Sequence, residues 1–187
     1  MKLQEVSLDT LPLRCMLPPT HSGLPAEYKI HAVWKTDDGA RWTGTSDGVW
    51  MVRPDSKEGD FEQVGPNFGV VNTVTLGTDG TIYMNTEWQG LVSYRDGQIE
   101  RLDTTIHNAS GLFLDDTDLW ICTTDGRLLL YDVEKKTLAD KSAACCLRGD
   151  TPWGIVVLDG NVWMLFNRRI LIYSPDKNVL RYILPSD

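Results

Sequence analysis

The feature of this sequence that most restricts its fold is an aromatic residue that recurs about every forty positions. The recurring residues are Trp42, Tyr83, Trp120 and Trp163, which follow one another at intervals of 41, 37 and 43 residues. In three of the four units a glycine stands three residues before the aromatic, and in three a second glycine follows six or seven residues after it. Repetition of this kind indicates an array of similar structural units.

Each unit is predicted to contain four short strands. In the first unit they are expected at about 30–35, 40–45, 49–53 and 60–64, joined by the turn sequences TDDG, SDG and PDSKEG. Four strands in about 40 residues is the period of a β-propeller blade. Helical repeats are excluded because no segment shows a 3.6-residue apolar spacing. We therefore expect an all-β chain, a small β-propeller of four blades with four antiparallel strands each, over about 30–65, 66–105, 106–146 and 147–187.

Residues 1–29 precede the blades and are expected to form an N-terminal edge strand, at Gln4–Leu8, followed by a proline-rich lead-in at Pro12–Pro25. Four blades suffice to close a ring within one chain. An open half-ring would expose strand edges, which natural proteins avoid. A monomer is therefore favoured, and the alternative is a homodimer in which each chain supplies half of an eight-bladed ring.

The composition restricts the partners. Among 187 residues, 18 lysines and arginines face 26 acidic residues, which gives a net charge of −8. Phosphate backbones and anionic lipids repel such a chain, so we expect no nucleic acid and no membrane partner, and a basic protein fits best. The N-terminus lacks an apolar signal core, which predicts a cytoplasmic protein, or a periplasmic one if a signal peptide has been removed. The four cysteines lack metal-binding spacing and are expected to be free thiols.

Two stretches resemble the repeat of the two-component regulator propellers. They are GARWTGTSDGV at Gly39–Val49 and DLWICTTDGRLLLYD at Asp118–Asp132. The family repeat typically reads D-x-x-G-x-L-W-x-G-T-x-x-G-L after a GLP-type lead-in, and SGLPAEYKIHAVWKTD at Ser22–Asp37 is similar to that lead-in. The second unit has Asn85 where the repeat has glycine, and the fourth has lost the Gly-Thr pair. The resemblance spans roughly residues 22 to 183 and implies a propeller, which in that family is the periplasmic sensing region of a membrane-bound kinase.

Positions that recur in every unit are expected to build the core. The recurring aromatics belong to this group, and so does Trp50, which is predicted to share its register with Leu91, Leu128 and Leu171. Aspartates recur in the first hairpin of each unit. They are interpreted as turn residues rather than calcium ligands, because no D-x-D-x-D-G loop is present.

Positions that break the repeat are candidates for function. They gather in the loops that lead from one unit to the next and in the second hairpin of each unit, which open on the same face of a propeller. Aromatic and arginine side chains are typical of interface hot spots, although a local role in capping a blade junction is as well supported for each residue alone. The predicted partner-binding residues are Trp88, Phe68, Trp153, Asn67, His107, Asn108, Arg168 and Arg169, with Tyr28 and Arg148 in the same loops.

Catalysis has little support. The chain lacks a G-x-S-x-G elbow, a phosphate loop and an H-E-x-x-H motif. His107 with Asp103 nearby is a weak candidate for a general base. The blades also resemble those of streptogramin lyase, but the three histidines do not match its catalytic pattern. We predict that the protein is not an enzyme, with no catalytic residues, no cofactor and no metal.

The sequence thus predicts a non-catalytic β-propeller that recognises a protein partner through one loop face. A short acidic chain suits an inhibitor or immunity-type protein that blocks a toxin or an enzyme. Two alternatives stay open. One is a ligand-sensing fragment of a two-component sensor, and the other is a lyase-like enzyme.

Overall fold

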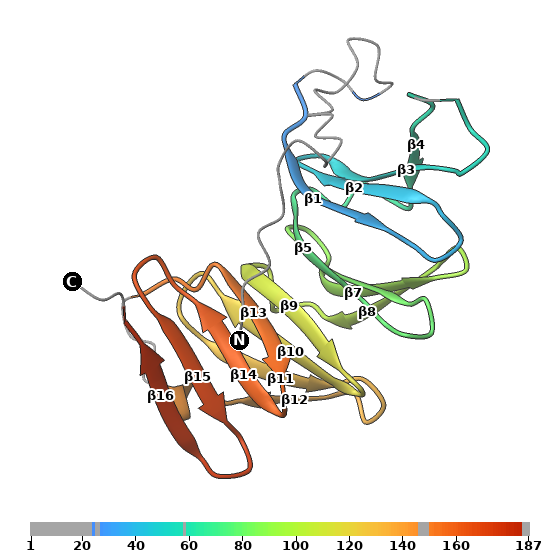
Figure 1. Ribbon diagram of the computed structural model, residues 1–187. Helices are drawn as coiled ribbons and strands as arrows, with labels where there is room; N and C mark the ends of the chain where they lie inside the picture. Colours follow the sequence, from blue (N-terminus) through green and yellow to red (C-terminus); the bar gives the residue numbers. More distant parts are fainter. Residues whose placement is uncertain (1–23, 25–26, 58, 146–149, 185–187) are drawn as a thin grey trace, which may run out of the picture.

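A computed structural model describes residues 24, 27–57, 59–145 and 150–184. It contains four sheets of four antiparallel strands each, arranged along the chain (Figure 1), which confirms the predicted fold class. The predicted strand at Gln4–Leu8 and the loop residue Arg148 lie outside the described residues.

Every sheet is a meander in which strands pair in sequence order. The first blade comprises β1 (Ile30–Lys35), β2 (Arg41–Thr45), β3 (Gly48–Val52) and β4 (Glu62–Val64). The second comprises β5 (Val71–Leu76), β6 (Ile82–Thr86), β7 (Gly90–Arg95) and β8 (Gln98–Asp103). The third comprises β9 (Ala109–Asp115), β10 (Asp118–Thr123), β11 (Leu128–Asp132) and β12 (Thr137–Asp140), followed by the short helix α1 (Ser142–Cys145). The fourth comprises β13 (Gly154–Leu158), β14 (Asn161–Leu165), β15 (Ile170–Ser174) and β16 (Val179–Ile183).

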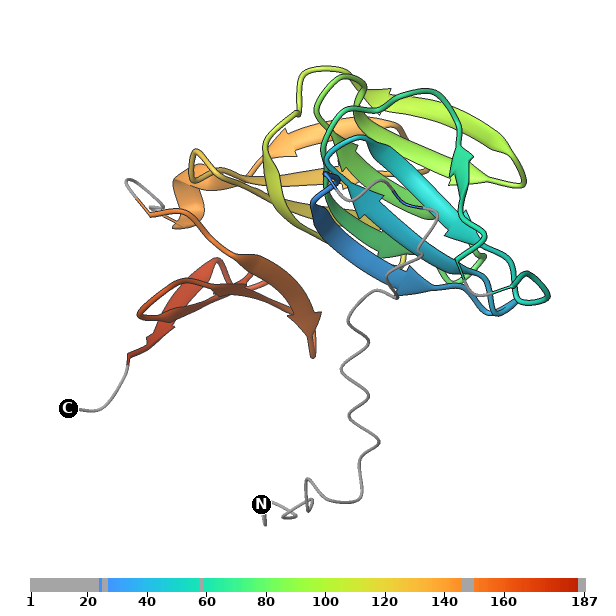
Figure 2. The ribbon, with the colours of Figure 1, turned by 90° about the horizontal axis from the view of Figure 1, so that it is seen from above.

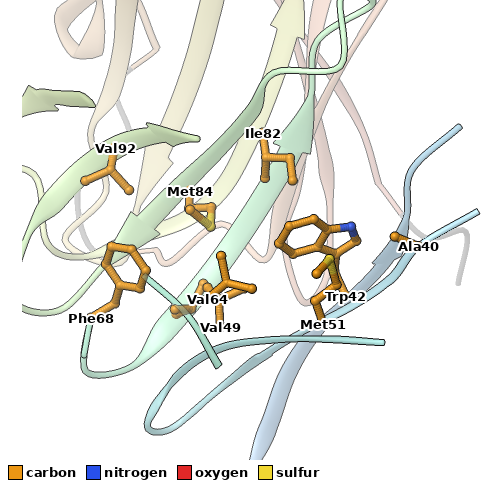
Figure 3. Packing of buried hydrophobic residues seen from close by; sticks show 10 residues of the cluster. Ala40, Trp42, Val49, Met51, Val64, Phe68, Ile82, Met84 and Val92 are labelled. Carbon is orange, nitrogen blue, oxygen red and sulfur yellow. The ribbon is translucent and has the colours of Figure 1, made fainter. Parts of the chain in front are cut away.

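An apolar core lies at each junction between consecutive blades. The first core packs Trp42, Val49 and Met51 against Ile82, Met84 and Val92 (Figure 3). The second packs Tyr83 and Leu91 against Leu119, Ile121 and Leu129. The third packs Trp120 and Leu128 against Val162, Met164 and Leu171. The hydrophobic effect therefore holds the blades together in chain order.

Alternation along the strands gives each blade two faces. We call the face that carries the recurring aromatic the trailing face, because it packs on the following blade, and the opposite one the leading face. Trp42, Tyr83 and Trp120 lie on trailing faces and are 5%, 8% and 4% exposed, which confirms their core role. Trp163 occupies the same position in the fourth blade but is only partly buried, because no described blade follows.

The four blades trace an open arc, whose ends are the first and the fourth blade (Figures 1 and 2). Within the described part of the chain, the three cores join successive blades, and none joins the fourth blade to the first. The closed ring within one chain that the sequence favoured is therefore not seen. The leading face of the first blade and the trailing face of the fourth have no blade packed on them.

The predicted register of Trp50 holds for Leu171 but is wrong by one position for Leu91 and Leu128. Trp50 pairs with Thr43 on the leading face of the first blade, where the ring of Tyr28 packs on it at 5.9 Å between centroids. The residues at the same position in the other blades are Val92, Leu129 and Leu171, whereas Leu91 and Leu128 lie on trailing faces. Trp50 is partly exposed because no blade covers that face.

The first hairpins bear out the turn role of the aspartates. The Asp38 carboxylate accepts hydrogen bonds from Thr36 Oγ1 (2.6 Å) and from the Ala40 backbone N–H (3.1 Å). The Asp79 carboxylate accepts from the backbone N–H of Thr81 (3.0 Å) and from its hydroxyl (2.9 Å). These are Asx-type turns, in which the side chain replaces a backbone acceptor.

A recurring threonine closes the second hairpin in three blades. Thr45 shows the pattern: its Oγ1 donates to the carbonyl of Gly48 (3.0 Å) and accepts from the backbone N–H of Asp47 (3.0 Å). Thr86 and Thr123 make similar contacts, and all three threonines are fully buried. In the fourth blade Phe166 replaces the threonine, and its backbone N–H donates to the carbonyl of Arg169 at 2.9 Å. These bonds fix the hairpin tips that the predicted site uses.

Candidate functional site

The second hairpins and the loops between blades are joined by backbone hydrogen bonds on one face of the arc. We call this surface the loop face; it comprises the loops 65–70, 104–108 and 150–153 and the hairpin tips 46–47, 87–89, 124–126 and 167–168. The backbone N–H of Glu87 donates to the carbonyl of Val70 (2.9 Å), and that of Thr124 donates to the carbonyl of Asn108 (2.8 Å). The Thr151 hydroxyl donates to the carbonyl of Thr124 at 2.9 Å. The loop face is therefore a connected surface.

A concavity of about 580 Å³ opens on the loop face. The loops before the third and the fourth blade form its walls, together with hairpin tips of the second and third blades. Its lining includes Glu87, His107, Asn108, Thr124, Thr151 and Trp153. Three of the predicted residues, His107, Asn108 and Trp153, thus meet in one hollow.

Trp88 lies beside this hollow. Its side chain is 58% exposed, and its ring packs over Gly69, where an added Cβ would come within 3.0 Å of two ring atoms. Glu87, the neighbour of Trp88, lines the concavity, and its carboxylate accepts a hydrogen bond from the Val70 backbone N–H at 3.2 Å. Trp88 therefore presents an aromatic surface at the edge of the hollow.

Trp153 is the second exposed tryptophan of the loop face. Its side chain is 69% exposed, although Pro152 just before it is buried. Its backbone N–H donates to the carbonyl of Leu165 at 2.7 Å. The backbone is thus held in place while the indole faces solvent.

The prediction that Phe68 contacts a partner is wrong, because the residue is buried. Its side chain is 0% exposed and belongs to the first core, near Met84 and Val92 (Figure 3). The phenyl ring cannot touch a partner without leaving this core, so Phe68 anchors its loop. Asn67 beside it stays exposed but braces the same loop: its Nδ2 donates to Asp47 Oδ1 (2.8 Å), and its Oδ1 accepts from the Gly69 N–H (2.9 Å).

Arg168 and Arg169 lie at the hairpin tip of the fourth blade and line a different concavity. Arg169 forms an ion pair with Asp150 at 2.6 Å. Its guanidinium lies 4.9 Å from the ring centroid of Phe166 and 5.7 Å from that of Tyr182. Arg169 therefore ties the hairpin to the loop of Trp153, whereas Arg168 is exposed.

Asn85 is a residue of the site that sequence reasoning missed. It is fully buried, and its Nδ2 donates to the carbonyl of Ile106 at 2.6 Å while its Oδ1 accepts from the Ala109 N–H at 3.0 Å. These two bonds clamp the loop that carries His107 and Asn108. The sequence did contain a sign of this role, because Asn85 stands where the regulator-propeller repeat has glycine.

Charge on the loop face is negative at Glu87 and at Asp125. The hydroxyl of Thr123 donates to the Asp125 carboxylate and lowers its pKa, and Arg127 and Asn108 act in the same direction. Asp125 is exposed and therefore carries its charge at neutral pH. Asp125 is paired with Arg127 at 3.1 Å, so a basic group on a partner would share this carboxylate with that arginine, whereas Glu87 lines the concavity.

The general-base arrangement weighed from the sequence is not formed. The Asp103 carboxylate accepts hydrogen bonds from the backbone N–H (2.7 Å) and the hydroxyl (2.6 Å) of Thr105, and within the described ranges no hydrogen bond joins it to His107. Cys122 lies beneath the site with its thiol buried, and burial raises its pKa to about 11. A thiol of that pKa is a poor nucleophile at neutral pH.

Comparison with known proteins supports the propeller fold. The extracellular domain of the putative hybrid two-component system BT4673 from B. thetaiotaomicron matches with a TM-score of 0.70 and 18% identity, over 87% of this chain. The computationally designed Ika4 protein matches with a TM-score of 0.61 and 11% identity, over 87% of this chain and 94% of its own length. The RRP9 WD40 repeats match with a TM-score of 0.65 and 13% identity, over 86% of this chain and 52% of theirs.

The chain spans 23% of the length of the BT4673 domain that it matches. No protein-family model matches the sequence, and no curated protein matches it. None of the described helices is long and apolar enough to cross a membrane. The chain is thus similar in fold to extracellular domains of putative two-component systems and to WD40 repeats.

Proposed function

We propose that this propeller module binds a protein partner through the loop face, with Trp153 in the concavity and Trp88 beside it as anchors. One observation carries the proposal: two tryptophans, 58% and 69% exposed, lie on a surface built from loops, where Trp153 lines a hollow and Trp88 follows the lining residue Glu87. Exposed tryptophan is disfavoured in water and is enriched at the hot spots of protein interfaces. The proposed function is binding without catalysis.

The loop face is also held rigid before any partner arrives. Asn85 clamps the loop of His107, and the backbone of Trp153 is bonded to the fourth blade. Thr151 further bonds its loop to the hairpin of the third blade. A surface that is already ordered loses less conformational entropy on binding, which favours affinity.

The partner that best fits this face is basic. The chain carries a net charge of −8, and Glu87 places a carboxylate in the lining of the hollow. Such a field speeds association with a cationic surface and weakens as salt rises. An inhibitor or immunity-type protein that covers a basic toxin or enzyme is the version of this proposal that we favour, and the cytoplasm is the compartment that the sequence predicts.

The second candidate function is the sensing of a small molecule. The concavity of about 580 Å³ falls within the roughly 300–1,000 Å³ that is usual for ligand pockets. The similar BT4673 structure is an extracellular domain of a putative two-component system, and an extracellular or periplasmic location would accompany this function. A small ligand would need His107, Asn108 and Thr151 but not Trp88, which lies outside the lining.

Capture from extracts of the source cell tests the proposal. The bait is the full chain as wild type, as the Trp88→Ala, Trp153→Ala double variant, and as Leu138→Ala, which truncates an exposed side chain on the outer strand β12. We expect wild type and Leu138→Ala to retain the same protein and the double variant to lose it. Equal recovery by all three baits would overturn the proposal. The single variants Trp88→Ala and Trp153→Ala are run beside these baits, and loss with Trp153→Ala alone would remove Trp88 from the binding face.

A further inference from the structure

The trailing face of the fourth blade is an uncovered apolar sheet. Leu165 is 53% exposed on β14, Leu158 is 49% exposed on β13 and Ile183 is 46% exposed on β16. Strand register places these side chains on the same face as Trp163. A hollow of about 360 Å³ lies on this face, lined in part by Val156, Trp163, Leu165 and Ile170.

In the other three blades the same face is an interface. Trp42, Tyr83 and Trp120 occupy the position of Trp163, and the next blade buries each of them. The terminal repeat of an array is usually capped by polar residues on its outer face. The fourth blade is instead as apolar as the covered ones: its four central positions on this face are Trp163, Leu165, Ile170 and Ile172, whereas the second blade has Tyr83, Asn85, Leu91 and Ser93.

The complementary surface is the leading face of the first blade. In the second blade this face presents Met84, Val92 and the partly buried Val74 to the preceding blade. The first blade has Thr43, Trp50 and Val33 at these positions, and Val33 is 70% exposed. The indole N–H groups of Trp50 and Trp163 lie on the two faces that no blade covers and have no acceptor among the described residues, and the Tyr28 ring packs on Trp50.

We propose that two copies of this chain join head to tail into an eight-bladed ring, in which the trailing face of each fourth blade packs on the leading face of the partner's first blade. A contact between two different surfaces generates a ring when the rotation closes. Propellers typically have four to eight blades. Two chains of four blades reach the upper end of this range, and three chains would exceed it.

The second copy is favoured over other occupants because the contact continues an interface that the chain already makes three times. Each of the three cores pairs a trailing face with a leading face in the same register. The described chain has one uncovered face of each kind, and they lie at opposite ends of the arc (Figures 1 and 2). Two copies related by a twofold axis would cover all four faces.

Sedimentation velocity of the full chain over a range of concentrations tests this inference. Wild type is expected at twice the 21.0 kDa chain mass. Leu165→Glu on the trailing face and Val33→Glu on the leading face are each expected to sediment as single chains, because each places a charge in both junctions. Leu138→Glu, an exposed position on β12, is the matched control and is expected to keep the wild-type mass.

Mixing the two variants identifies which faces meet. A Leu165→Glu chain keeps an intact leading face, and a Val33→Glu chain keeps an intact trailing face. Their mixture therefore regains one of the two junctions, and a two-chain species is expected to return with weaker affinity than wild type. Near-ultraviolet circular dichroism establishes that each variant is folded, and Leu165→Ala, which adds no charge, is expected to weaken association about tenfold, equal to about 1.4 kcal/mol.

Three results would overturn the inference. Wild type that stays a single chain at every concentration would mean that no second copy covers these faces, and that further blades or another protein do. Single chains for Leu165→Glu but paired chains for Val33→Glu would indicate contact between like faces. A ladder of larger assemblies would show that the junction forms but the ring does not close.

Discussion

The side-chain amide of Asn85 donates a hydrogen bond to the carbonyl oxygen of Ile106 at 2.6 Å. Asn85 lies on β6 in the second blade, and Ile106 lies in the loop that enters the third, so the bond joins two blades below the concavity. Ile106 is itself buried in the second core. This hydrogen bond connects the second blade to the candidate site, because the loop of Ile106 also carries His107 and Asn108.

Replacing Asn85 by alanine tests this clamp. The change leaves the Ile106 carbonyl and the Ala109 N–H without their partners in a buried region, and we expect unfolding free energy to fall by about 2–3 kcal/mol. Urea denaturation measures this change. Gln98→Ala, at an exposed position on β8, is the control and is expected to shift stability by less than about 0.5 kcal/mol. A loss for Asn85→Ala as small as for the control would contradict the clamp.

Substitution of Gly69 by alanine tests how Trp88 is seated. Gly69 has a φ of 66°, and its added Cβ would also meet the Trp88 ring at 3.0 Å, whereas Gly97 has a φ of 82° and open space around it. Both variants are expected to lose about 1 kcal/mol from backbone strain, and Gly69→Ala more because of the clash. In a Trp88→Ala background the extra loss should shrink. If it persists unchanged, the clash is with the Glu87 carboxylate, whose Oε2 would lie 2.8 Å from the added Cβ, and not with the Trp88 ring.

The Cys122 thiol is expected to resist alkylation in the native state. Burial raises its pKa from 9.0 to about 11, so the reactive thiolate is scarce at pH 8. Site-resolved mass spectrometry after treatment with N-ethylmaleimide should find Cys122 unmodified in folded protein and modified in denaturant. Rapid native labelling of Cys122 would show that the third core is open.

The raised pKa of the Cys122 thiol also determines how the stability of the protein changes with pH. The unfolded thiol ionises near pH 9, whereas the native thiol holds its proton to about pH 11. Between these values the native state binds more protons, so this contribution to stability is complete below pH 9 and is lost as pH rises toward 11. Unfolding of wild type and Cys122→Ala across this range is expected to show a steeper decline for wild type.

Arg169 is predicted to steady the loop of Trp153 through its ion pair with Asp150. The pair is partly exposed, so we expect Arg169→Ala to speed amide hydrogen exchange at Trp153 only about three- to tenfold. The Trp153 N–H is a suitable reporter because it is bonded to the carbonyl of Leu165. Arg168→Ala, one residue away and exposed, is the control. Equal exchange rates in both variants would remove this role from Arg169.

The sequence predicted the strands well because a strand pattern and its turn residues are local properties. Runs of β-branched and aromatic residues between aspartate and glycine turns placed the first three strands within one residue of the observed bounds of β1, β2 and β3. The error at Trp50 has a local cause. Between the last paired residues, the second hairpin has an even number of residues in the first and fourth blades (two and four) and an odd number in the second and third (three and five). Counting from the aromatic therefore shifts the register by one.

Two other features could not be predicted from short stretches of sequence. Phe68 is a loop residue by its neighbours in sequence, and its burial depends on side chains from another blade, such as Val92. The open arc depends on the angle between packed sheets, which the repeat pattern does not encode. Among the site residues, His107, Asn108 and Trp153 were predictable because they break the repeat, whereas Glu87 and Thr151 resemble ordinary turn residues.

Oxidative footprinting of the captured complex tests the binding face most directly. Hydroxyl-radical labelling of the full chain, free and bound to the protein that it retains from source-cell extract, reports the solvent access of each side chain. We predict that labelling of Trp88 and Trp153 falls several-fold on binding, while labelling of Leu138 on β12 stays unchanged. Undiminished labelling of both tryptophans in a complex that protects another surface would contradict the loop face as the binding site.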